Sequence, residues 1–507
     1  MSKTMRSRPF VELTAVSKSF VPGHPVLEDI TLAFRRGEIH AVLGENGAGK
    51  STLLNILFGM HQPDMGGILL DGRQVVHRSP ADAISNRIGM VHQHFKLVAS
   101  FTVAENLRLA APATIRKTLR NDADIARIAD DFGLPVDPST IVSSLPLSLQ
   151  QRVEILKALI NRAELILFDE PTTILNPAEI DAFYGVLTQI ATEGRAVVVV
   201  THHLEEVLDH AQHVSVIRRG KLISSAPVGN RKRSDLVREI VGKDIDLTAP
   251  LEREGGAEGP IELRLENIDV APTQSSSGLR GASLTLRSGE VVGVAGVEGN
   301  GQRELFEVLA GLRKPDSGTV EARHAHKDGR AFAGLVPEDR HHEGLVLDLP
   351  VSINLLLNKI GQTPYAKRGR LIHSRINAAA EHMRTQSDVR TRSIHVTPRT
   401  LSGGNQQKIV LARAMNEDAP VVIVYQPTRG LDVAASEDVL KKLRLAANAG
   451  KAVLIISSNL DEIIRISDRI VVLFAGRTVG EVTSTTSRED IGDLMTGGRQ
   501  TRTEHRS

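Results

Sequence analysis

The chain has 507 residues, which is too long for a single hydrophobic core and predicts two or more domains. Its net charge of +2 gives no electrostatic reason to expect nucleic acid as a partner. The absence of cysteine excludes disulfides, zinc–thiolate sites and iron–sulfur clusters. The longest apolar runs, such as AVVVV at 196–200, are far shorter than the roughly 20 residues that cross a bilayer, so we expect no membrane span.

The first element with chemical meaning is a glycine-rich segment between a predicted strand, EIHAVL at 38–43, and a predicted helix, STLLNILFG at 51–59. It reads GENGAGKS and fits the pattern G-x-x-x-x-G-K-[ST]. In such a turn the backbone N–H groups face phosphate oxygens, and the helix N-terminus adds positive potential. An ordinary glycine-rich turn is the alternative, but the strand before it and the helix after it favour nucleotide binding. The residues predicted to bind nucleotide here are Gly44, Glu45, Asn46, Gly47, Ala48, Gly49, Lys50 and Ser51.

Polar residues at three later positions extend this prediction. Gln93 lies in VHQHF, Asp169 and Glu170 end the apolar run LILFDE, and His202 follows the run AVVVVT. We expect Ser51, Asp169 and Gln93 to hold Mg²⁺, Glu170 to polarise the attacking water, and His202 to contact the γ-phosphate. Taken singly, an acidic helix cap and a structural histidine are the simpler interpretations. The order of the residues behind the glycine-rich loop favours the catalytic one.

The second half of the chain repeats the first. GVEGNG at 296–301 matches GENGAG at 44–49, and YQPTRGLD at 425–432 matches FDEPTTILN at 168–176. Unbroken apolar runs alternate with helical patterns in each half, which predicts an α/β fold with a mainly parallel sheet.

Linker composition separates the two copies, because Gly, Pro and charged residues dominate TAPLEREGGAEGP. We therefore predict one domain over 1–247, a linker over 248–260 and a second domain over 261–507.

Together these motifs resemble a tandem ATP-binding cassette (ABC) ATPase over nearly the whole chain. GENGAGKS resembles the Walker A motif, Gln93 the Q-loop, LILFDE the Walker B motif and His202 the switch histidine. LSGGNQQK at 401–408 resembles the cassette signature, which implies that Ser402, Gly403 and Gly404 contact ATP. The resemblance implies two P-loop domains, each with a parallel core, an antiparallel β-subdomain and a helical subdomain. It also places Phe20 against adenine, although a core phenylalanine is an equal alternative.

The second half lacks the polar residues of the first. Its counterparts of Lys50, Ser51, Gln93, Asp169, Glu170 and His202 are Gln302, Arg303, Glu338, Tyr425, Gln426 and Ser458. Conversely, the first-half counterpart of the signature reads LPLSLQQR at 145–152. In ABC proteins each ATP lies between the Walker motifs of one cassette and the signature of the other. The resemblance therefore implies one intact and one degenerate composite site, and we expect weak or unhydrolysed nucleotide at the second.

Three second-half stretches, GVEGNGQREL, VPEDR and QPTRGLDV, resemble importer ATPases for simple sugars and nucleosides. IGMVHQHFKLVASFTVAENL is closer to the nucleoside branch, whereas LPLS departs from the LSVG that is usual in this group. Such importers use ATP and Mg²⁺, two integral membrane permeases and an external solute-binding protein, with the ATPase peripheral at the cytoplasmic face of the membrane. The alternatives are a soluble tandem cassette protein that acts on ribosomes or nucleic acid, and a regulatory nucleotide-binding protein without a transport partner.

Overall fold

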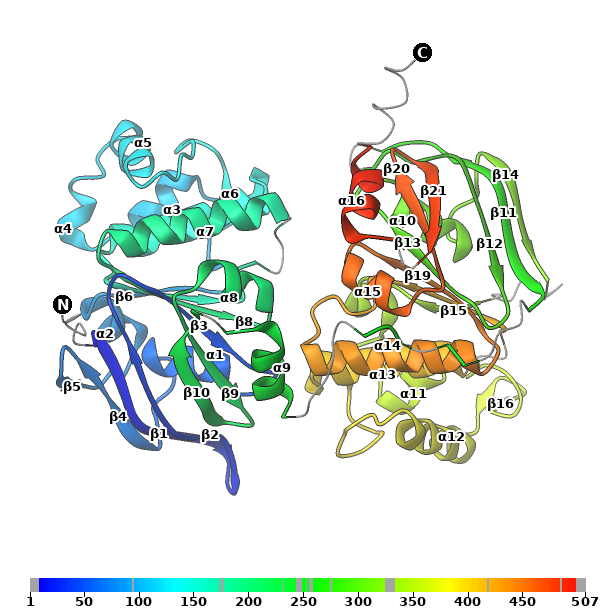
Figure 1. Ribbon diagram of the computed structural model, residues 1–507. Helices are drawn as coiled ribbons and strands as arrows, with labels where there is room; N and C mark the ends of the chain where they lie inside the picture. The colour runs from blue at the N-terminus through cyan, green and yellow to red at the C-terminus, as the bar shows by residue number, and fades with distance from the viewer. Residues whose placement is uncertain are drawn as a thin grey trace, which may run out of the picture. The chain divides into compact units, whose positions relative to one another are not determined.

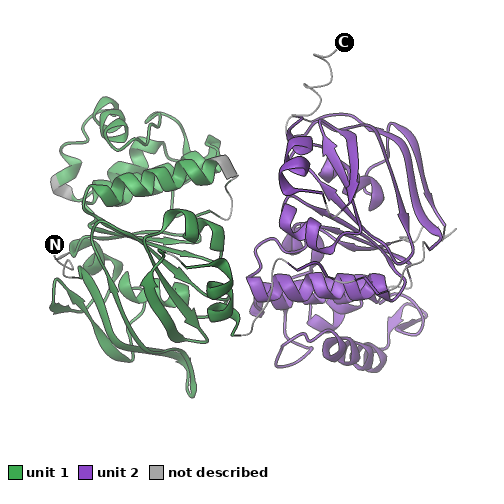
Figure 2. Ribbon diagram, viewed as in Figure 1, with its two compact units in different colours: residues 1–245 green, residues 246–507 purple. Residues whose placement is uncertain are grey.

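The computed structural model describes residues 9–497 except 94, 173–174, 176, 230, 243–248, 252, 255–258, 274–275, 324–332, 417–418 and 484–485. The chain divides into two compact units, Met1–Ile245 and Asp246–Ser507 (Figures 1 and 2). In the described part of the chain, none of the helices is both long enough and apolar enough to cross a membrane.

Unit 1 contains two sheets. The first is a four-stranded antiparallel sheet, β2-β1-β4-β5, and the second is a six-stranded sheet, β10-β9-β3-β8-β7-β6, that is parallel except for the β9–β10 pair. Their strands are β1 Val11–Val21, β2 His24–Phe34, β3 Ile39–Leu43, β4 Met65–Leu70, β5 Arg73–Val75, β6 Ile88–Val91, β7 Leu165–Asp169, β8 Ala196–Thr201, β9 His213–Arg218 and β10 Lys221–Pro227.

The helices of unit 1 pack mainly around the parallel sheet, and α3 to α6 form a helical part at the end opposite the antiparallel sheet (Figure 1). They are α1 Lys50–Leu57, α2 Pro80–Ser85, α3 Val103–Ala110, α4 Ala113–Arg116, α5 Asp122–Asp131, α6 Leu147–Ile160, α7 Pro177–Thr192, α8 Leu204–His210 and α9 Arg233–Val241, with a 3₁₀ turn at Val142–Ser144.

Unit 2 repeats this plan, with a three-stranded antiparallel sheet β12-β11-β14 and a six-stranded sheet β15-β18-β19-β13-β20-β21. A short hairpin, β16-β17, is an addition to the plan. The strands are β11 Ile261–Val270, β12 Leu279–Arg287, β13 Val291–Ala295, β14 Ser317–Ala322, β15 Ala333–Val336, β16 Ala366–Lys367, β17 Arg370–Leu371, β18 Val421–Tyr425, β19 Ala452–Ser457, β20 Arg469–Phe474 and β21 Arg477–Thr483.

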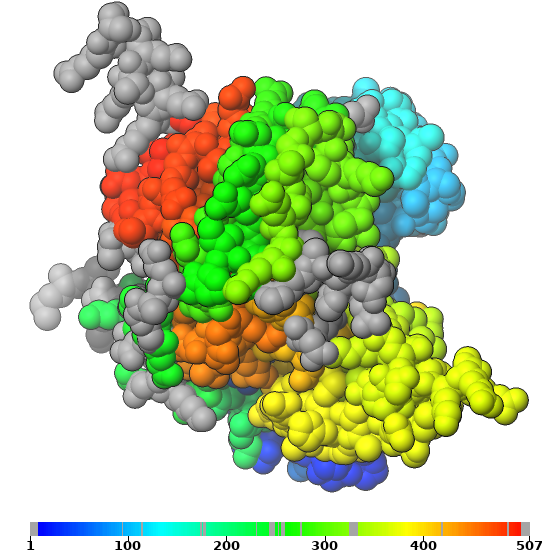
Figure 3. Space-filling view, turned by 90° about the vertical axis from the view of Figure 1, so that its right-hand side faces the viewer, coloured from blue at the N-terminus to red at the C-terminus, as the bar shows by residue number. Residues whose placement is uncertain are grey.

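The antiparallel strands of unit 2 (green) lie beside its C-terminal strands (red) in the space-filling view (Figure 3). The backbone N–H of Ser283 on β12 donates to Thr478 Oγ1 on β21 at 3.3 Å. The helices are α10 Gln302–Leu309, α11 Val351–Leu355, α12 His373–Gln386, α13 Gly403–Met415, α14 Val433–Asn448, α15 Leu460–Ile466 and α16 Arg488–Thr496, with a π-helical turn at Arg340–Gly344 and a 3₁₀ turn at Pro398–Thr400.

The α/β class and the three-part plan of each half are as the sequence indicates. Every residue of β7 and β8 is buried, which is why these strands read as continuous apolar runs. The domain bounds remain a prediction, although the described part of the predicted linker packs on unit 2. There Leu251 donates its backbone N–H to the Arg465 carbonyl at 2.8 Å, and Arg465 Nε donates to the Ala249 carbonyl at 3.2 Å.

Two phenylalanines of the antiparallel sheet in unit 1 provide a matched test of the core. Phe34 is fully buried, whereas Phe20 is 53% exposed. We expect Phe34→Ala to lower the free energy of unfolding by about 3–5 kcal/mol. Phe20→Ala should change it by about 0.5 kcal/mol or less, because more than half of Phe20 is already exposed to solvent in the folded chain. Denaturant titration followed by circular dichroism measures both, and equal losses would contradict this packing.

Candidate active site

The glycine-rich loop of unit 1 joins the end of β3 to the start of α1. Gly47 and Gly49 have φ values of 81° and 104°, in the left-handed region that favours glycine. A Cβ on Gly49 would lie 2.7 Å from the carbonyl oxygen of Val26, and one on Gly44 would lie 2.2 Å from that of Ile217. The loop therefore requires glycine at these positions for backbone geometry and for close packing against neighbouring strands.

Lys50 and Ser51 begin α1 and meet two different groups. The buried ammonium of Lys50 donates to the carbonyl oxygens of Gly44 at 2.7 Å and Glu45 at 3.0 Å, so its charge stays over the loop. Ser51 Oγ donates to Asp169 Oδ1 at 3.0 Å. Thus two of the three residues predicted to bind magnesium, far apart in sequence, are brought together where β3 and β7 end.

Glu170, Gln93 and His202 form a second cluster beside this pair. Gln93 Nε2 donates to Glu170 Oε2 at 3.4 Å, and His202 Nδ1 lies 3.4 Å from Glu170 Oε1. Glu170 has φ of 47°, unusual for a residue with a side chain, and its backbone N–H donates to the Val200 carbonyl at 2.9 Å. All three predicted catalytic residues therefore meet at the carboxyl ends of the parallel strands, where such sheets bind ligands.

The two carboxylates of this cluster differ in their electrostatic surroundings. Burial raises the pKa of Asp169, although its hydrogen bond with Ser51 acts in the opposite direction. Burial also disfavours charge on Glu170, but contact with His202 and the nearby charges of His202 and Lys50 outweigh it and lower the pKa of Glu170. Glu170 thus stays ionised at neutral pH, as a group that polarises a water molecule must.

Buried side chains from α6 and α8 form hydrogen bonds with the turn that follows Glu170. Gln151 of α6 donates Nε2 to the Pro171 carbonyl at 2.9 Å. Glu206 of α8 accepts from the hydroxyls of Thr172 at 2.9 Å and Tyr184 at 3.0 Å. Sequence reasoning missed these supporting residues. The repeat could have revealed them, because the second half has glutamine, threonine and glutamate at the positions that match Gln151, Thr172 and Glu206.

Unit 2 has the same loop and strand-end turn as unit 1, but other residues replace the lysine, serine, aspartate and glutamate of the unit 1 site. Gly301 has φ of 104°, the same as Gly49, but Gln302 in place of lysine donates Nε2 to the Val297 carbonyl at 2.9 Å. Arg303 donates to Glu307 at 2.9 Å and to Glu343 at 3.1 Å, and these hydrogen bonds, that to Glu343 foremost, raise its pKa. The cation at this position is neutralised inside its own unit.

Uncharged residues, Tyr425 and Gln426, stand at the end of β18, where unit 1 has Asp169 and Glu170. Tyr425 replaces the aspartate, is buried in the core, and its ring centroid lies 5.7 Å from that of Phe306. Gln426 keeps a left-handed φ of 50° and donates Nε2 to Ser458 Oγ at 2.9 Å, where unit 1 has Glu170 beside His202. Glu338, the counterpart of Gln93, is in an ion pair with Arg429. The positions that match Asp169 and Glu170 therefore carry no carboxylate in unit 2.

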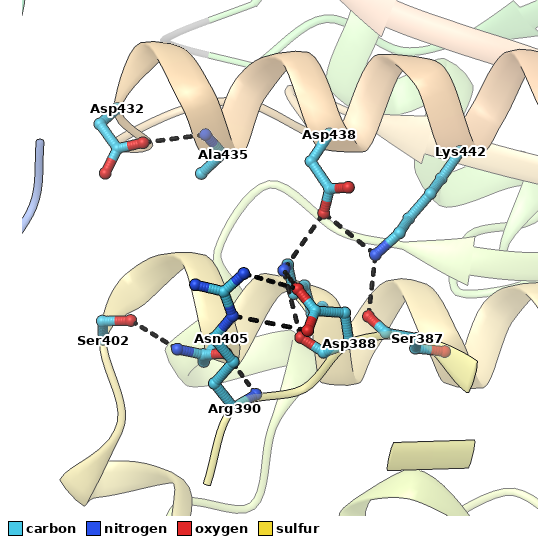
Figure 4. A network of polar contacts seen from close by, with 10 residues as sticks. Ser387, Asp388, Arg390, Ser402, Asn405, Asp432, Ala435, Asp438 and Lys442 are labelled. Carbon is cyan, nitrogen blue, oxygen red and sulfur yellow. Dashed lines mark hydrogen bonds and ion pairs between the residues drawn. The ribbon is translucent and has the colours of Figure 1, made fainter. Parts of the chain in front are cut away.

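The residues that resemble the signature begin α13 in unit 2. Ser402 is the N-cap, and its Oγ accepts from Asn405 Nδ2 at 2.9 Å (Figure 4). Asn405 Oδ1 in turn accepts the backbone N–H of Arg390 at 2.8 Å. Lys408 Nζ pairs with Asp388 at 2.8 Å and with Asp438 of α14 at 3.3 Å. This network fixes the first turns of α13 and holds the serine hydroxyl in place.

The two glycines of this helix start sit in confined space. A Cβ on Gly403 would lie 2.9 Å from Arg340 Nη2, and one on Gly404 would lie 3.3 Å from the Cβ of Ala435. In unit 1 the matching helix begins at Leu147, whose side chain is 51% exposed, with Pro146 at the N-cap. Pro146 has neither a hydroxyl nor a backbone N–H, so this helix start cannot present the same donors.

Both signature-like helices nevertheless retain the Gln-Gln pair, and the reason is structural. Gln407 of α13 donates Nε2 to the Pro427 carbonyl at 2.8 Å, as Gln151 does to Pro171 in unit 1. The buried glutamine therefore supports the strand-end turn of its own unit whether or not that turn carries a carboxylate.

Comparison with known proteins decides the family. The sequence profile described as ABC transporter matches residues 27–173 and 279–429, one match in each half. The chain belongs to the ABC transporter family. It is 39% identical to the nucleoside import ATP-binding protein NupA of Lactococcus lactis, over 97% of this chain and 99% of that protein. It is 40% identical to the guanosine import ATP-binding protein NupO of Bacillus subtilis, over 97% and 98%.

A third relative is also an import ATP-binding protein. The ribose import ATP-binding protein RbsA 1 of Rubrobacter xylanophilus is 37% identical over 97% of this chain and 99% of that protein. A solved ATP-binding cassette of an ABC transporter in its ADP conformation aligns with 47% of this chain and all of its own, at 19% identity and a TM-score of 0.42. Because the profile matches once in each half, the chain is an ABC ATPase with tandem cassettes, as its motifs indicate.

The first cassette has donors that fit a nucleoside triphosphate with magnesium. The loop supplies backbone N–H groups and the Lys50 ammonium, and Ser51 and Asp169 supply hard oxygen ligands. Over the described residues, no group of three or more His, Cys, Asp or Glu is arranged to hold a metal ion. A cation beside Ser51 therefore needs further oxygen ligands, which phosphates provide.

Phe20 lies on β1, and its 53% exposure rules out the core phenylalanine that the sequence allowed. Its ring packs edge to face against His61, with centroids 5.0 Å apart, and Lys18 Nζ lies 5.6 Å from its centroid. A solvent-facing ring on this sheet is compatible with stacking on adenine, which remains a prediction.

Glu462 in the second cassette is the counterpart of Glu206 and allows a pH test of the scaffold. It accepts hydrogen bonds from Thr428, from Ser457 at 3.3 Å and from Asn459 at 3.1 Å. Burial raises its pKa to about 7 despite these partners. Because its folded pKa lies above the ordinary value, its contribution to stability is fully present below that value and is lost as the pH rises through 7.

We therefore expect the unfolding free energy of the wild type to fall more than that of Glu462→Gln between about pH 5 and about pH 8, by roughly 1.4 kcal/mol per unit of pKa shift. Denaturant titrations of both proteins at several pH values measure this difference. Parallel pH profiles would show that Glu462 is not held protonated by its surroundings.

Proposed function

We propose that this chain is the ATP-hydrolysing subunit of an importer for nucleosides or simple sugars, and that its first cassette carries out the chemistry. The observation that supports this most is the convergence of Ser51 with Asp169 and of Gln93 and His202 with Glu170 at one strand edge. The matching edge of the second cassette carries a neutral Gln426–Ser458 pair.

The proposed mechanism assigns one task to each group of the first cassette. Lys50 and the loop N–H groups bind the β and γ phosphates and stabilise the charge that develops on them. Ser51 and Asp169 would hold magnesium, which would neutralise phosphate charge, and we assign Gln93 as a further ligand. Glu170 orients and polarises the attacking water, and its lowered pKa keeps it able to accept a hydrogen bond from that water. His202 positions Glu170 and contacts the γ-phosphate.

Following the family resemblance, we propose that Ser402, Gly403 and Gly404 complete this ATP site, with the serine held by Asn405. We further propose that the second cassette contributes little hydrolysis. Its arginine is neutralised by Glu307 and Glu343, and it lacks a general base. Any nucleotide that it binds would remain uncleaved.

The importer assignment rests on the relatives. NupA, NupO and RbsA 1 are import ATP-binding proteins for nucleosides, guanosine and ribose, and each aligns with 97% of this chain. We propose that the chain acts with two integral membrane permeases and an extracytoplasmic solute-binding protein, at the cytoplasmic face of the membrane. The rival, a soluble tandem ATPase for ribosomes or nucleic acid, gains no support from the net charge of +2.

One substitution tests the single-site proposal. We expect Glu170→Gln to reduce steady-state ATP hydrolysis by at least about 100-fold while leaving ATP affinity nearly unchanged, because the amide keeps the shape but cannot act as a base. Gln426→Ala is the matched control and should cost little. Colorimetric phosphate release and equilibrium binding of labelled ATP measure the two quantities. Substantial turnover by Glu170→Gln would mean that the second cassette hydrolyses ATP.

A second experiment tests the importer assignment. We expect the isolated chain to be a poor ATPase, because its site is completed only when the cassettes close and partners shift that population. Reconstitution with the permeases and loaded solute-binding protein should raise the turnover number several-fold above that of the isolated chain. Full activity of the isolated chain, unaffected by solute, would contradict this, and activation by ribosomes would establish the rival.

A further inference from the structure

The β16–β17 hairpin of unit 2 concentrates positive charge on an exposed turn. Lys367 and Arg370 are paired across the hairpin, and the turn between them is Arg368-Gly369, with φ of 50° and 74°. These three cationic side chains are exposed, and Leu371 at the end of the hairpin is 43% exposed. The yellow segment that includes the hairpin projects from the surface of unit 2 (Figure 3).

The arrangement of these charges does not favour stability by itself. Lys367 lies directly opposite Arg370, and like charges at such a cross-strand position repel each other. Helix α12 follows at once and has no acidic residue in its first turn, while His373 and Arg375 near its start oppose the helix dipole. The sequence from 349 to 380 contains no aspartate or glutamate that could offset these charges.

Within the described parts of the chain, the three hairpin cations and Arg375 form no ion pair. The counterpart region of unit 1 also has exposed cations, at Arg116, Lys117 and Arg120, but an acidic helix start follows them directly. There Arg108 pairs with Asp122 at 2.8 Å, and α5 begins with Asp122 and Asp124 under an Asn121 cap. The second cassette differs because no acidic residue follows its hairpin cations before Glu381, so nothing nearby in the sequence offsets their charge.

We propose that this hairpin binds the phosphate headgroups of anionic lipids at the membrane surface. Each lysine or arginine near such a surface strengthens attachment about fivefold, so the cluster provides substantial attraction without a membrane span. The exposed Leu371 beside the cations suits an interface that is apolar below its charged layer. This inference rests on the proposed function, because it requires the chain to work beside a membrane.

Co-sedimentation of the full chain with lipid vesicles tests the proposal. Wild-type protein should bind vesicles of phosphatidylcholine mixed with phosphatidylglycerol and should bind pure phosphatidylcholine vesicles weakly, with salt reducing the difference. The combined variant Lys367→Gln, Arg368→Gln, Arg370→Gln should lose at least about tenfold in affinity for the anionic vesicles. Its matched control, Arg280→Gln, Lys314→Gln, Arg477→Gln, removes the same charge from exposed positions elsewhere in unit 2 and should bind as the wild type does.

Equal binding by the hairpin variant and the wild type, or no preference for anionic vesicles, would overturn the inference. So would a hairpin variant that binds vesicles normally but no longer assembles with the permeases, since the partner would then be an acidic protein segment. Solute-stimulated ATP hydrolysis by the permease complex is measured on the same preparations. Failure of lipid binding with hydrolysis intact overturns this inference alone, whereas failure of solute stimulation with lipid binding intact overturns the proposed function.

Discussion

The turn that follows β7 is the constraint on which the first site depends. Glu170 must adopt a left-handed φ of 47° to point its carboxylate toward Gln93 and His202, and a residue with a side chain does not choose that conformation unaided. Its own N–H bond to Val200 and the Gln151 bond to the Pro171 carbonyl hold the turn from two sides. The signature-like helix of a cassette thus supports the catalytic strand of the same cassette.

The second cassette shows that this scaffold and the chemistry are separable. Gln426 keeps a left-handed φ of 50°, and its backbone N–H donates to the Ile456 carbonyl at 2.8 Å. Gln407 still donates to the Pro427 carbonyl, although position 426 carries no carboxylate. The differences are electrostatic. A neutral Gln426–Ser458 pair stands where the first cassette has Glu170 beside His202, and Arg303 is paired with glutamates of its own unit. A cassette that retains its fold while its charges cancel is suited to a supporting role.

The sequence predicted the α/β class, the repeat and the convergence of Asp169 with Ser51, because buried parallel strands and a phosphate loop have strong local signatures. It could not decide whether Phe20 is exposed or part of the core, since the exposure of one ring depends on how β1 packs. It missed Gln151 and Glu206, whose partners are backbone carbonyls and hydroxyls distant in sequence. It also missed the hairpin charge, because Lys367 opposite Arg370 is visible only once the strand register is known.

The central claim is that one cassette hydrolyses ATP and the other does not. Single-turnover hydrolysis by Lys50→Ala and by Gln302→Ala, each in the complete importer complex, tests it most directly. The account predicts that Lys50→Ala loses at least about 100-fold in rate, because the phosphate charge loses its buried cation, whereas Gln302→Ala stays within about threefold of wild type. Comparable losses in the two variants would show that both cassettes take part in the chemistry.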